Sequence, residues 1–526
     1  MKKENLVYSE NIDLLFNQNQ GQKISSKNKI DTNKEYAEYI KKNKSKFFFI
    51  FIIIFIFGFS SYIKGQNINL TMFINKIKQQ FGYKERIDEL CEKIEPLYLF
   101  KLRLETEPIK LCENKNNGQN HICYMNKFND YFYLKNGVTC TMNNIIIDPS
   151  KSSQTNILYK GPVDQSYRGA PILKTGFFNM NCPIEEKKFT GYDGNYNVYF
   201  NSWNYKYDQK DEKVLEELAP GKTIFFISRN QDSPNIFHGD SELINVVATM
   251  DLLKLKPEDI VIVFLESMLI KDDPFYDLYK SLISRGGGPF YIRDLKKEYI
   301  ISSAVHVPIN WDSSVFLTNS FPNCGTTPGK AYKLLNDLIL KYMDIPEYED
   351  SFISDNEIYY YPKKVIDNHS SIRKYRKLIT FQWRKVWPKG RTGQYRVLGN
   401  GPELADHLAN ILPNDFLVRL VDTAGLTIRQ QIALMRKTDY LVGIHGAGLC
   451  LSIYMSNQSI LHEILPSKNM GVLTLMSALS GHRTYSDILR ANIRWIEGSE
   501  YVFFNVKHFL KRVILHMKEN KYFENY

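Results

Sequence analysis

Several signatures of common enzyme classes are missing from this chain of 526 residues. No Cys-x-x-Cys pair occurs, which argues against zinc or thiol redox chemistry. The chain also lacks the Gly-x-Gly-x-x-Gly turn of dinucleotide-binding oxidoreductases and the Gly-x-Ser-x-Gly turn that carries the nucleophile of many serine hydrolases. No Asp-x-Asp occurs either, so the sequence lacks the carboxylates that commonly hold a metal-bound diphosphate.

The composition is that of a large folded protein with a basic balance. Hydrophobic residues make up 43% and aromatic residues 13% of the chain, a load that a disordered protein does not carry. A chain of 526 residues is too long to fold around a single hydrophobic core, so we expect two lobes, an anchor and a stem. The net charge of +11 is spread along the chain without a basic stripe interleaved with aromatic residues. This distribution disfavours nucleic acid as a partner and suits a phosphorylated small molecule.

An apolar segment near the N-terminus indicates the compartment. Phe47–Ile63 carries no charged residue and is just long enough to span a bilayer. Four lysines within residues 41–46 precede it and only Lys64 follows closely, so the positive-inside rule places everything after Lys64 in the lumen. We therefore expect a single-pass type II protein of the Golgi or endoplasmic reticulum membrane. A cleaved signal peptide is the alternative, although no clear cleavage site follows.

The cysteines agree with a secretory location. All seven follow the apolar segment, and five of them lie between Cys91 and Cys182. We predict one or two disulfides in that stretch and, from the odd count, at least one free thiol. The spacing does not determine the connectivity.

Beyond residue 220, short apolar runs alternate with amphipathic helical segments, which is the pattern of parallel sheets with crossover helices. In the first half we expect strands at 223–228, 259–264 and 303–309, and helices at 241–255 and 331–343. In the second half we expect strands at 377–382, 416–421, 440–444 and 460–465, and helices at 402–412 and 427–437.

Three further regions complete the interpretation. Residues 91–200 show only short β-like runs, at 143–148 and 196–200, and are interpreted as an irregular front of the first lobe. Residues 345–375 are expected to link the lobes. The last segment, Tyr501–Met517, places five apolar residues on one helical face, namely Phe509, Leu510, Val513, Ile514 and Met517.

These patterns predict a domain order. The chain is divided into a cytoplasmic tail (1–46), a transmembrane helix (47–63), a stem (64–90), an N-terminal lobe (91–370) and a C-terminal lobe with a closing helix (371–526). Each lobe is expected to be a doubly wound, Rossmann-like α/β unit. A ligand should then bind in the cleft facing the carboxyl ends of the strands.

The strongest local motif is DYLVGIHGAGL, Asp439–Leu449. An apolar strand leads into a turn with Gly443, Gly446 and Gly448, after which a helix is expected. Glycines in such a turn let backbone amides approach a phosphate closely, and the start of a helix adds partial positive charge. The alternative is a tight turn that binds nothing.

Four motifs in this order resemble those of glycosyltransferase family 61. The glycine turn is followed by HEILP at 462–466, and is preceded by SPNIFHGDSELINV at 233–246 and by FQWRKVWPKGRTGQYRVLGNGPEL at 381–404. A further helix, RQQIALMRKTDY at 429–440, leads into the turn. The resemblance covers about residues 233–490. Members of that family include EGF-domain-specific O-GlcNAc transferases and plant xylosyltransferases.

The resemblance implies a fold and a reaction. It implies the GT-B architecture, in which the C-terminal lobe holds the nucleotide sugar and the N-terminal lobe holds the acceptor. It implies an inverting transfer of a sugar, N-acetylglucosamine or a pentose, from a donor such as a UDP-sugar to a hydroxyl of a glycoprotein or glycan. No cofactor is expected, and no metal. The nucleotide-sugar donor is a co-substrate.

The resemblance also implies roles for particular residues. The donor would be bound by Arg384, Arg391, His445, the amides of Gly446, Ala447 and Gly448, and Glu463, whose carboxylate would accept hydrogen bonds from ribose hydroxyls. Paired arginines are expected near residues 382–384, but the sequence there is Gln-Trp-Arg, so Arg396 stays a candidate beside Arg384 and Arg391.

The inverting step needs a general base on the first lobe. His238 is the first candidate, in a loop before a helix, and Asp240 and Glu242 are the alternatives. A buried structural role is the competing interpretation for a lone histidine.

Two other function classes remain to be weighed. A catalytically silent, lectin-like member would bind UDP without transferring a sugar. A nucleotide-dependent oxidoreductase would bind NAD(H), but its glycine fingerprint is missing.

Overall fold

The computed structural model of the chain describes part of the compact unit Tyr83–Tyr526. The predicted tail, transmembrane segment and stem (1–90) and the predicted donor-binding residues Arg384 and Arg391 lie outside the described residues. Among the described residues, no helix is long and apolar enough to cross a membrane. The described residues are 109–125, 138–152, 173–182, 199–207, 215–228, 236–265, 274–307, 329–343, 345, 358–361, 377–383, 396–456, 458–465, 476–478, 480–488, 491–496 and 499–522.

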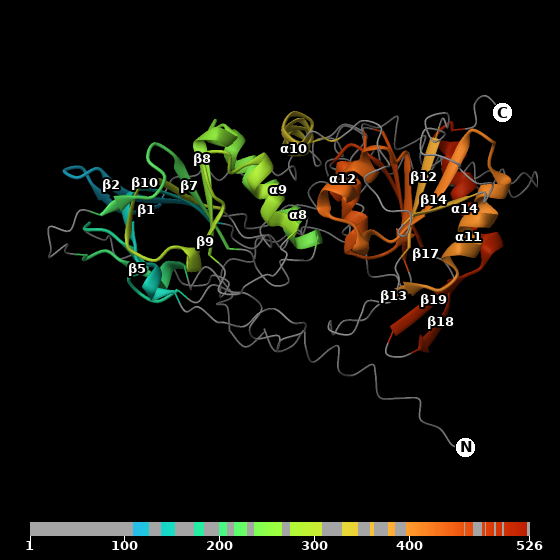
Figure 1. The fold of residues 1–526 in the computed structure, drawn as a ribbon, viewed down its shortest axis with the longest axis horizontal. Helices are drawn as coiled ribbons and strands as arrows, with labels where there is room; N and C mark the ends of the chain where they lie inside the picture. The colour runs from blue at the N-terminus through green and yellow to red at the C-terminus, as the bar shows by residue number, and fades with distance from the viewer. Residues whose placement is uncertain are drawn as a thin grey trace, which may run out of the picture. The chain divides into compact units, whose positions relative to one another are not determined.

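The fold is mixed α/β, with three sheets among the described residues (Figure 1). The first sheet has the order β1-β2-β3-β10-β7-β8-β9, in which β7, β8, β9 and β10 are parallel and β1, β2 and β3 form an antiparallel extension beside β10. Its strands are β1 (Ile109–Asn114), β2 (Gln119–Met125), β3 (Val138–Ile147), β7 (Thr223–Ile227), β8 (Ile260–Phe264), β9 (Phe290–Tyr291) and β10 (Tyr299–His306), with the short β4 (Phe178–Asn179), β5 (Trp203–Asn204) and β6 (Glu216–Glu217) beside them.

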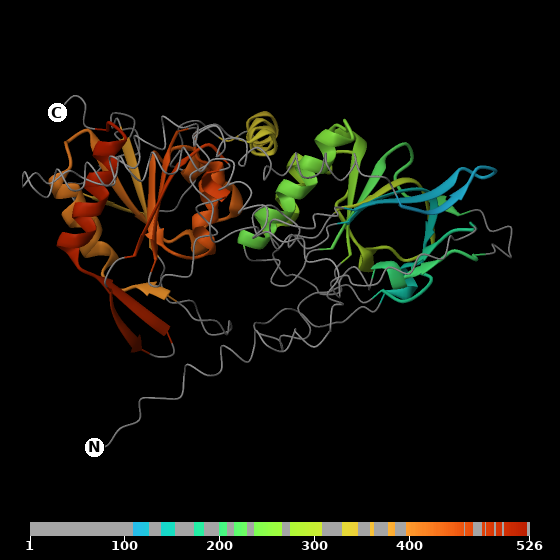
Figure 2. The same cartoon turned by 180° about the vertical axis from the view of Figure 1, so that it is seen from behind.

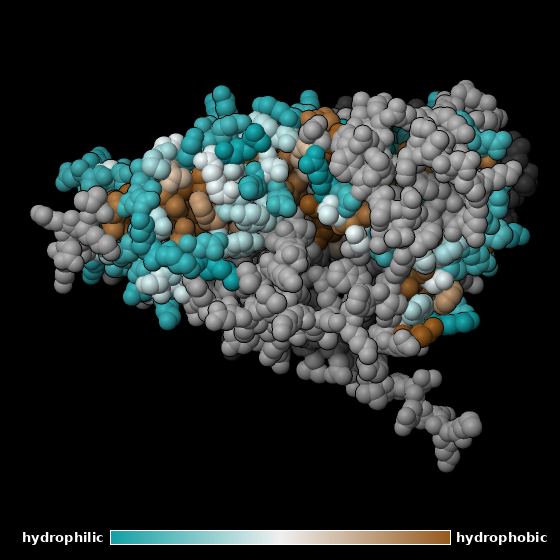
Figure 3. All heavy atoms as spheres, in the orientation of Figure 1, coloured by the Kyte–Doolittle hydropathy of each residue, from teal (hydrophilic) through white to brown (hydrophobic). Residues whose placement is uncertain are grey.

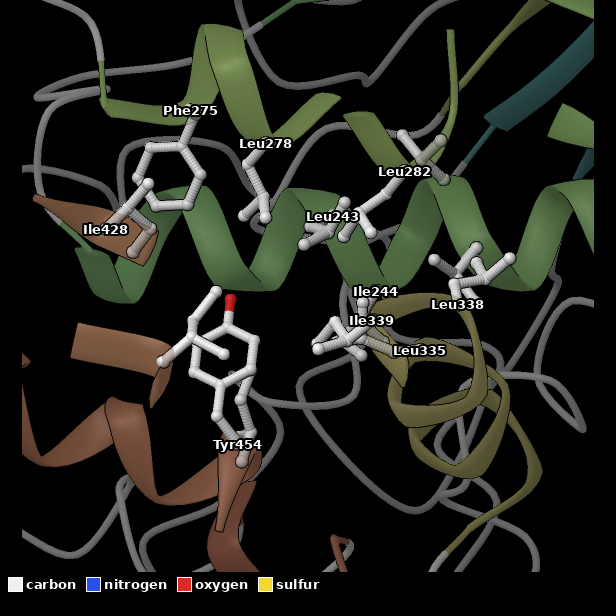
Figure 4. Packing of buried hydrophobic residues seen from close by; sticks show 14 of the residues in the cluster. Leu243, Ile244, Phe275, Leu278, Leu282, Leu335, Leu338, Ile339, Ile428 and Tyr454 are labelled. Atoms are coloured by element: carbon white, nitrogen blue, oxygen red, sulfur yellow. The ribbon is translucent and has the colours of Figure 1, made fainter. Parts of the chain in front are cut away.

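Helices α8 (Ile236–Leu252), α9 (Pro274–Leu282) and α10 (Lys330–Tyr342) accompany the first sheet. Helix α8 packs tightly against α9 at Gly239, where any side chain would overlap the ring of Phe275. On α8, Ile244 lies beside Leu335 and Ile339 of α10, whereas Leu243 lies on the side of α9 (Figure 4).

The second sheet has the order β11-β14-β12-β15-β16-β17. All of its strands are parallel except β11, which pairs antiparallel with β14. Helices α11 (Gly401–Ile411) and α14 (Val506–Glu519) lie side by side in both views (Figures 1 and 2). The strands are β11 (Ile358–Tyr361), β12 (Lys377–Gln382), β14 (Phe416–Val421), β15 (Tyr440–Ile444), β16 (Ile460–Leu465) and β17 (Arg483–Ile488), with helix α12 (Ile428–Arg436) and the 3-10 helix η10 (Ala447–Tyr454) between them.

A third, three-stranded sheet has the order β13-β19-β18, from β13 (Arg396–Leu398), β18 (Ala491–Ile496) and β19 (Ser499–Phe504). Its edge strand β18 exposes Ile493 and Ile496 (44% each), and Figure 3 shows hydrophobic surface in that region.

Each of the two larger sheets has one point where its strand order reverses. In the first sheet the chain runs from β7 to β8 and β9 on one side and to β10 on the other, so the reversal lies between β7 and β10. In the second sheet it runs from β12 to β14 on one side and to β15, β16 and β17 on the other, so the reversal lies between β12 and β15. Ligands of open parallel sheets bind beyond the carboxyl ends of the strands at such points.

Most predicted elements occur as expected. Strands β12, β14, β15 and β16 have the predicted bounds, and the five apolar residues of the last helix all belong to its packed face, with Phe509, Val513 and Met517 fully buried. Two disulfides, Cys112–Cys182 and Cys123–Cys140, confirm the cysteine prediction, and Cys450 is free.

Other expectations were wrong. Residues 501–504 belong to β19, and the last helix begins only at Val506, because the apolar pattern of a short strand continues into that of the helix. Ile358–Tyr361, expected in a linker, is an edge strand of the second sheet. The stretch interpreted as irregular contains the antiparallel strands β1, β2 and β3, while Tyr199 and Phe200, in a β-like run, are helical.

Candidate functional site

The strand-order reversal of the second sheet brings together the ends of β12 and β15. Gln382 ends β12, and Ile444 ends β15 just before the turn His445–Gly448. The amide of His445 donates to the carbonyl of Ile464 (2.9 Å), which continues the ladder between β15 and β16 by one residue. The predicted glycine turn thus stands where a doubly wound sheet binds its ligand.

A buried carboxylate holds the ring of His445. Nδ1 of His445 is hydrogen-bonded to Oε1 of Glu463, and the hydroxyl of Ser486 donates to Oε2 of the same carboxylate (3.2 Å). The Glu463 side chain is fully buried, whereas that of His445 is 17% exposed. Because an ionised carboxylate only accepts, the proton of a neutral His445 sits on Nδ1, and Nε2 is then its basic nitrogen.

This geometry places Glu463 on the buried side of His445. Both oxygens of its carboxylate have protein donors, from β15's turn and from β17. The predicted contact of Glu463 with ribose hydroxyls stays a prediction, and the burial of the side chain favours a role in orienting His445.

Three successive backbone amides follow His445. Those of Gly446, Ala447 and Gly448 donate to no described residue, whereas the amide of Leu449 donates to the carbonyl of Gly446 (2.9 Å). They open η10, whose first amides have no partner within the helix. The sequence predicted an amide-lined turn here, and the helix that follows it is a 3-10 helix.

Packing explains one of the glycines. A side chain at Gly448 would overlap the carboxamide of Gln382, whose Nε2 donates to the hydroxyl of Thr423 (3.0 Å). The side chain of Gln382, at the end of β12, therefore lies against the start of η10. Sequence analysis missed both Gln382 and Thr423. The only signal that could have indicated them is their position, because Gln382 ends one predicted strand and Thr423 closely follows another.

The three predicted base candidates lie on α8, within the helix and not in a loop before it. His238 is half-buried, with its ring against Phe237 (centroids 5.4 Å apart). Asp240 and Glu242 are buried. Helix α8 follows β7 and so begins at the carboxyl edge of the first sheet, beside that sheet's own strand-order reversal.

Asp240 is buried in an environment that favours its neutral form over its ionised form. The hydroxyl of Tyr454, at the end of η10, donates to its Oδ1 (2.5 Å), and Figure 4 shows that hydroxyl pointing toward α8. Burial raises the pKa of Asp240 well above its ordinary value, by more than the hydrogen bond lowers it. A raised pKa disfavours the ionised form that could accept a proton, so this environment favours the other candidates over Asp240 as the base.

Cys450, on η10, is within electrostatic range of both Asp240 and Glu463. Burial raises the pKa of its thiol, and the carboxyl groups of Asp240 and Glu463 raise it further. Both carboxyls therefore lie within electrostatic reach of one residue of η10. The hydrophobic core around η10 also combines residues of α8, α9, α10 and α12 (Figure 4).

Two clusters of described residues could hold a metal ion by their ligand types. In the first, His121 lies beside Cys123 and Cys140, but these cysteines form a disulfide and offer no thiolate. The second consists of His462, Asp487 and His516. Neither lies among the residues that surround the glycine turn.

Residues 298–461 match the family model described as Glycosyltransferase 61. The match begins just before β10 and ends inside β16, so it includes Gln382 and the turn His445–Gly448. Helix α8 and Glu463 lie outside it. No curated protein matches the chain.

Proposed function

The chain carries a glycosyltransferase family 61 domain and is a glycosyltransferase, and on this premise we propose which reaction it performs. It transfers a sugar, N-acetylglucosamine or a pentose, with inversion from a UDP-linked donor to a hydroxyl of a glycoprotein or glycan. The observation that carries the proposal is the row of three amides beside His445 at the strand-order reversal of the second sheet.

The diphosphate of the donor is assigned to this turn. The amides of Gly446, Ala447 and Gly448 are donors at the start of a helix, where partial positive charge favours an anion. His445 adds a donor when its ring is protonated, with Glu463 balancing that charge from behind. Charge on the leaving diphosphate grows in the transition state, so donors fixed in advance stabilise it more than they stabilise the ground state.

Side-chain cations complete the neutralisation in this proposal. Arg384 and Arg391 follow Gln382, the last residue of β12, by two and nine positions in the sequence. Their assignment depends on this short separation along the chain from the end of a strand that borders the turn. With arginines and amides in place, donor binding needs no metal ion.

The acceptor is assigned to the carboxyl edge of the first sheet. His238, half-buried in the first turn of α8, is the proposed base that takes the proton from the attacking hydroxyl. Glu242 and Asp240 remain the alternatives, and burial, which raises the pKa of Asp240, favours Glu242 of the two. The two sheets then form the two halves of a GT-B enzyme.

The location in the cell is part of the same proposal. The apolar segment Phe47–Ile63 anchors the chain in the Golgi or endoplasmic reticulum membrane, with the catalytic portion in the lumen. Two disulfides fit an oxidising lumen. Protease treatment of sealed microsomes should leave the C-terminus intact, and its digestion without detergent would refute this topology.

Titration of the purified full-length protein with UDP tests the donor site. We expect binding in the presence of EDTA with an affinity that manganese does not change. Replacement of His445 by Ala should weaken it by about 1–3 kcal/mol, because a hydrogen bond to a charged group is lost. Replacement of His482 by Ala, at a buried histidine outside the site, serves as the control. Binding that requires manganese would refute the metal-free site.

A further inference from the structure

Two histidines and an aspartate converge on the side of the second sheet that faces α14. Nε2 of His516, on α14, lies 2.7 Å from Oδ2 of Asp487, on β17. Nε2 of His462, on β16, lies 3.0 Å from the same oxygen. All three side chains are at most 8% exposed.

This cluster is separate from the proposed donor site. Successive side chains of a strand point to opposite faces of a sheet, and Glu463 and Ser486 point toward the glycine turn. Their neighbours in the chain, His462 and Asp487, therefore point the other way. No residue of the cluster takes part in the contacts around His445 described above.

Two other polar atoms of the cluster, Nδ1 of His462 and Oδ1 of Asp487, have partners of their own, and Nδ1 of His516 has a more distant carboxylate neighbour. The hydroxyl of Tyr440 lies 3.0 Å from Nδ1 of His462, and a carboxylate oxygen of Glu519 lies 3.7 Å from Nδ1 of His516. The guanidinium of Arg512 lies 3.2 Å from Oδ1 of Asp487. In metal sites, the ring nitrogens that do not bind the metal are held in this way by hydroxyls and carboxylates, and ligand carboxylates are themselves anchored.

Two ring nitrogens of the cluster, Nε2 of His462 and Nδ1 of His516, make no hydrogen bond with the described residues. The first of these is buried and lies close to Asp487. A buried polar atom without a partner costs about 1–3 kcal/mol, unless something else binds it. Two imidazole nitrogens and a carboxylate oxygen within 4.8 Å of one another are a set that binds zinc.

We propose that His462, Asp487 and His516 bind one zinc ion that fastens α14 to β16 and β17. Zinc–ligand bonds of about 2.0–2.2 Å place tetrahedral ligands roughly 3.3 Å apart, so each histidine nitrogen needs to move away from Oδ2 of Asp487 by only about 0.3–0.6 Å. The described residues supply three ligands, and a water molecule completes four. Magnesium and calcium prefer oxygen ligands and fit this set poorly.

Charge is consistent with a dication at this place. Asp487 and Glu519 bring two negative charges and Arg512 one positive charge, so zinc leaves the cluster with a single positive charge. Arg512 and Glu519 are 40% and 51% exposed, so water screens them and gives the ion a route from the surface of α14.

Metal content and melting temperature of the full-length protein test this site. After removal of metal with EDTA and addition of zinc, we expect about one equivalent of tightly held zinc and a rise in melting temperature of roughly 3 °C or more. Magnesium should give no rise. Cobalt, used as a coloured probe for zinc, should produce the visible absorption of a four-coordinate site.

Glutamine variants separate metal binding from a plain hydrogen-bond network. His462→Gln and His516→Gln keep an N–H donor near Asp487 but lose the imidazole ligand, so each should lose the bound zinc and the thermal shift. His482→Gln, a buried histidine outside the cluster, should keep both.

Two results would overturn the proposal. One is a wild-type protein that takes up no zinc and shows no cobalt spectrum. The other is equal zinc binding by the wild type and both cluster variants, which would place the ion at other residues. Because wild-type cobalt absorption needs no variant, it decides the question even if a glutamine variant fails to fold. UDP affinity is expected to persist in metal-free protein, which keeps this test apart from the donor site.

Discussion

At the scale of single residues, the candidate donor site depends on how Glu463 is used. The carboxylate is buried and accepts from His445 and Ser486. If Glu463 binds ribose, its substitution should act independently of His445. If Glu463 only orients His445, the effects of substituting the two residues should not add, so a pair of variants separates the two roles.

Glu463→Ala should weaken UDP binding by about 1–3 kcal/mol, because His445 loses the partner that fixes its ring. If Glu463 only orients His445, the double variant with His445→Ala should bind UDP no more weakly than His445→Ala alone. Calorimetric titration of the four proteins measures this coupling. Additive losses would indicate that Glu463 contacts the nucleotide directly.

Asp240 and His238 are predicted to behave differently although they are neighbours on α8. Asp240→Asn keeps the shape of the side chain and resembles the neutral form that burial favours, so turnover should stay within about threefold of the parent. His238→Ala should lower turnover by ~10²–10⁴ with UDP affinity nearly unchanged, the usual range for a lost general base. A dead Asp240→Asn enzyme that still binds UDP would instead make Asp240 the base.

The sequence predicted part of this site and missed the rest for physical reasons. Residues joined by a short local pattern, such as His445–Gly448, could be assigned because a strand, a turn and a helix follow one another. Gln382 and Tyr454 could not, because their partners, Gly448 and Asp240, are far away in the chain. The same holds for the zinc cluster: the absence of Cys-x-x-Cys argued against zinc, while the three ligands are spread from β16 to α14.

At the scale of elements, the turn after β15 and the end of β12 act as one unit. Gly448 allows Gln382 to lie under the start of η10, and Gln382 in turn binds Thr423. The prediction of a glycine turn was therefore right for a reason partly different from the one given: at least one glycine makes room for a side chain.

Gly448→Ala should weaken UDP binding more than tenfold, because the added methyl group displaces either the turn or Gln382. Gln382→Ala creates the missing room, so the double variant should bind UDP more tightly than Gly448→Ala alone. Titration of the three variants and the parent tests this. A Gly448→Ala protein with parental affinity would show that the position of the turn does not matter for the donor.

The prediction of strands succeeded where a strand is buried on both faces and therefore appears in the sequence as an uninterrupted apolar run. Strands β12, β14, β15 and β16 are apolar runs of a parallel sheet buried on both faces, and such runs are distinctive. Strands β1, β2 and the first half of β3 contain Asn, Thr and Cys, and their antiparallel pairing is partly held by disulfide Cys123–Cys140, so only the β-like run at 143–148, at the end of β3, indicated this part of the sheet.

At the scale of the whole molecule, two buried histidines make stability depend on pH. Burial lowers the pKa of His121 and of His306 to about 3, and each also lies in an aromatic cluster with Tyr199. Their unfolded-state pKa is about 6.5, so the unfolded chain binds more protons between these values. The stabilisation is complete above about pH 6.5 and is lost as the pH falls toward 3.

Urea unfolding between pH 7.5 and 4.5 measures this effect. His306→Phe keeps an aromatic ring against Tyr199 and removes one titrating group, so its stability should fall less steeply with acidity, by roughly 1 kcal/mol per pH unit. Asp240, whose pKa is raised, acts in the opposite sense and is the same in both proteins. Parallel pH curves for the parent and the variant would mean that His306 is not neutral and buried in the native state.

The central claim is that the turn after β15 holds the diphosphate of a UDP-sugar during transfer. Release of UDP from a panel of UDP-sugars, with glycoprotein acceptors and purified full-length protein, tests it most directly when the parent and His445→Ala are compared side by side. The account predicts that the parent uses one donor of the panel and that the variant releases UDP from it at least tenfold more slowly. Equal rates for the two proteins would contradict the placement of the donor at this turn.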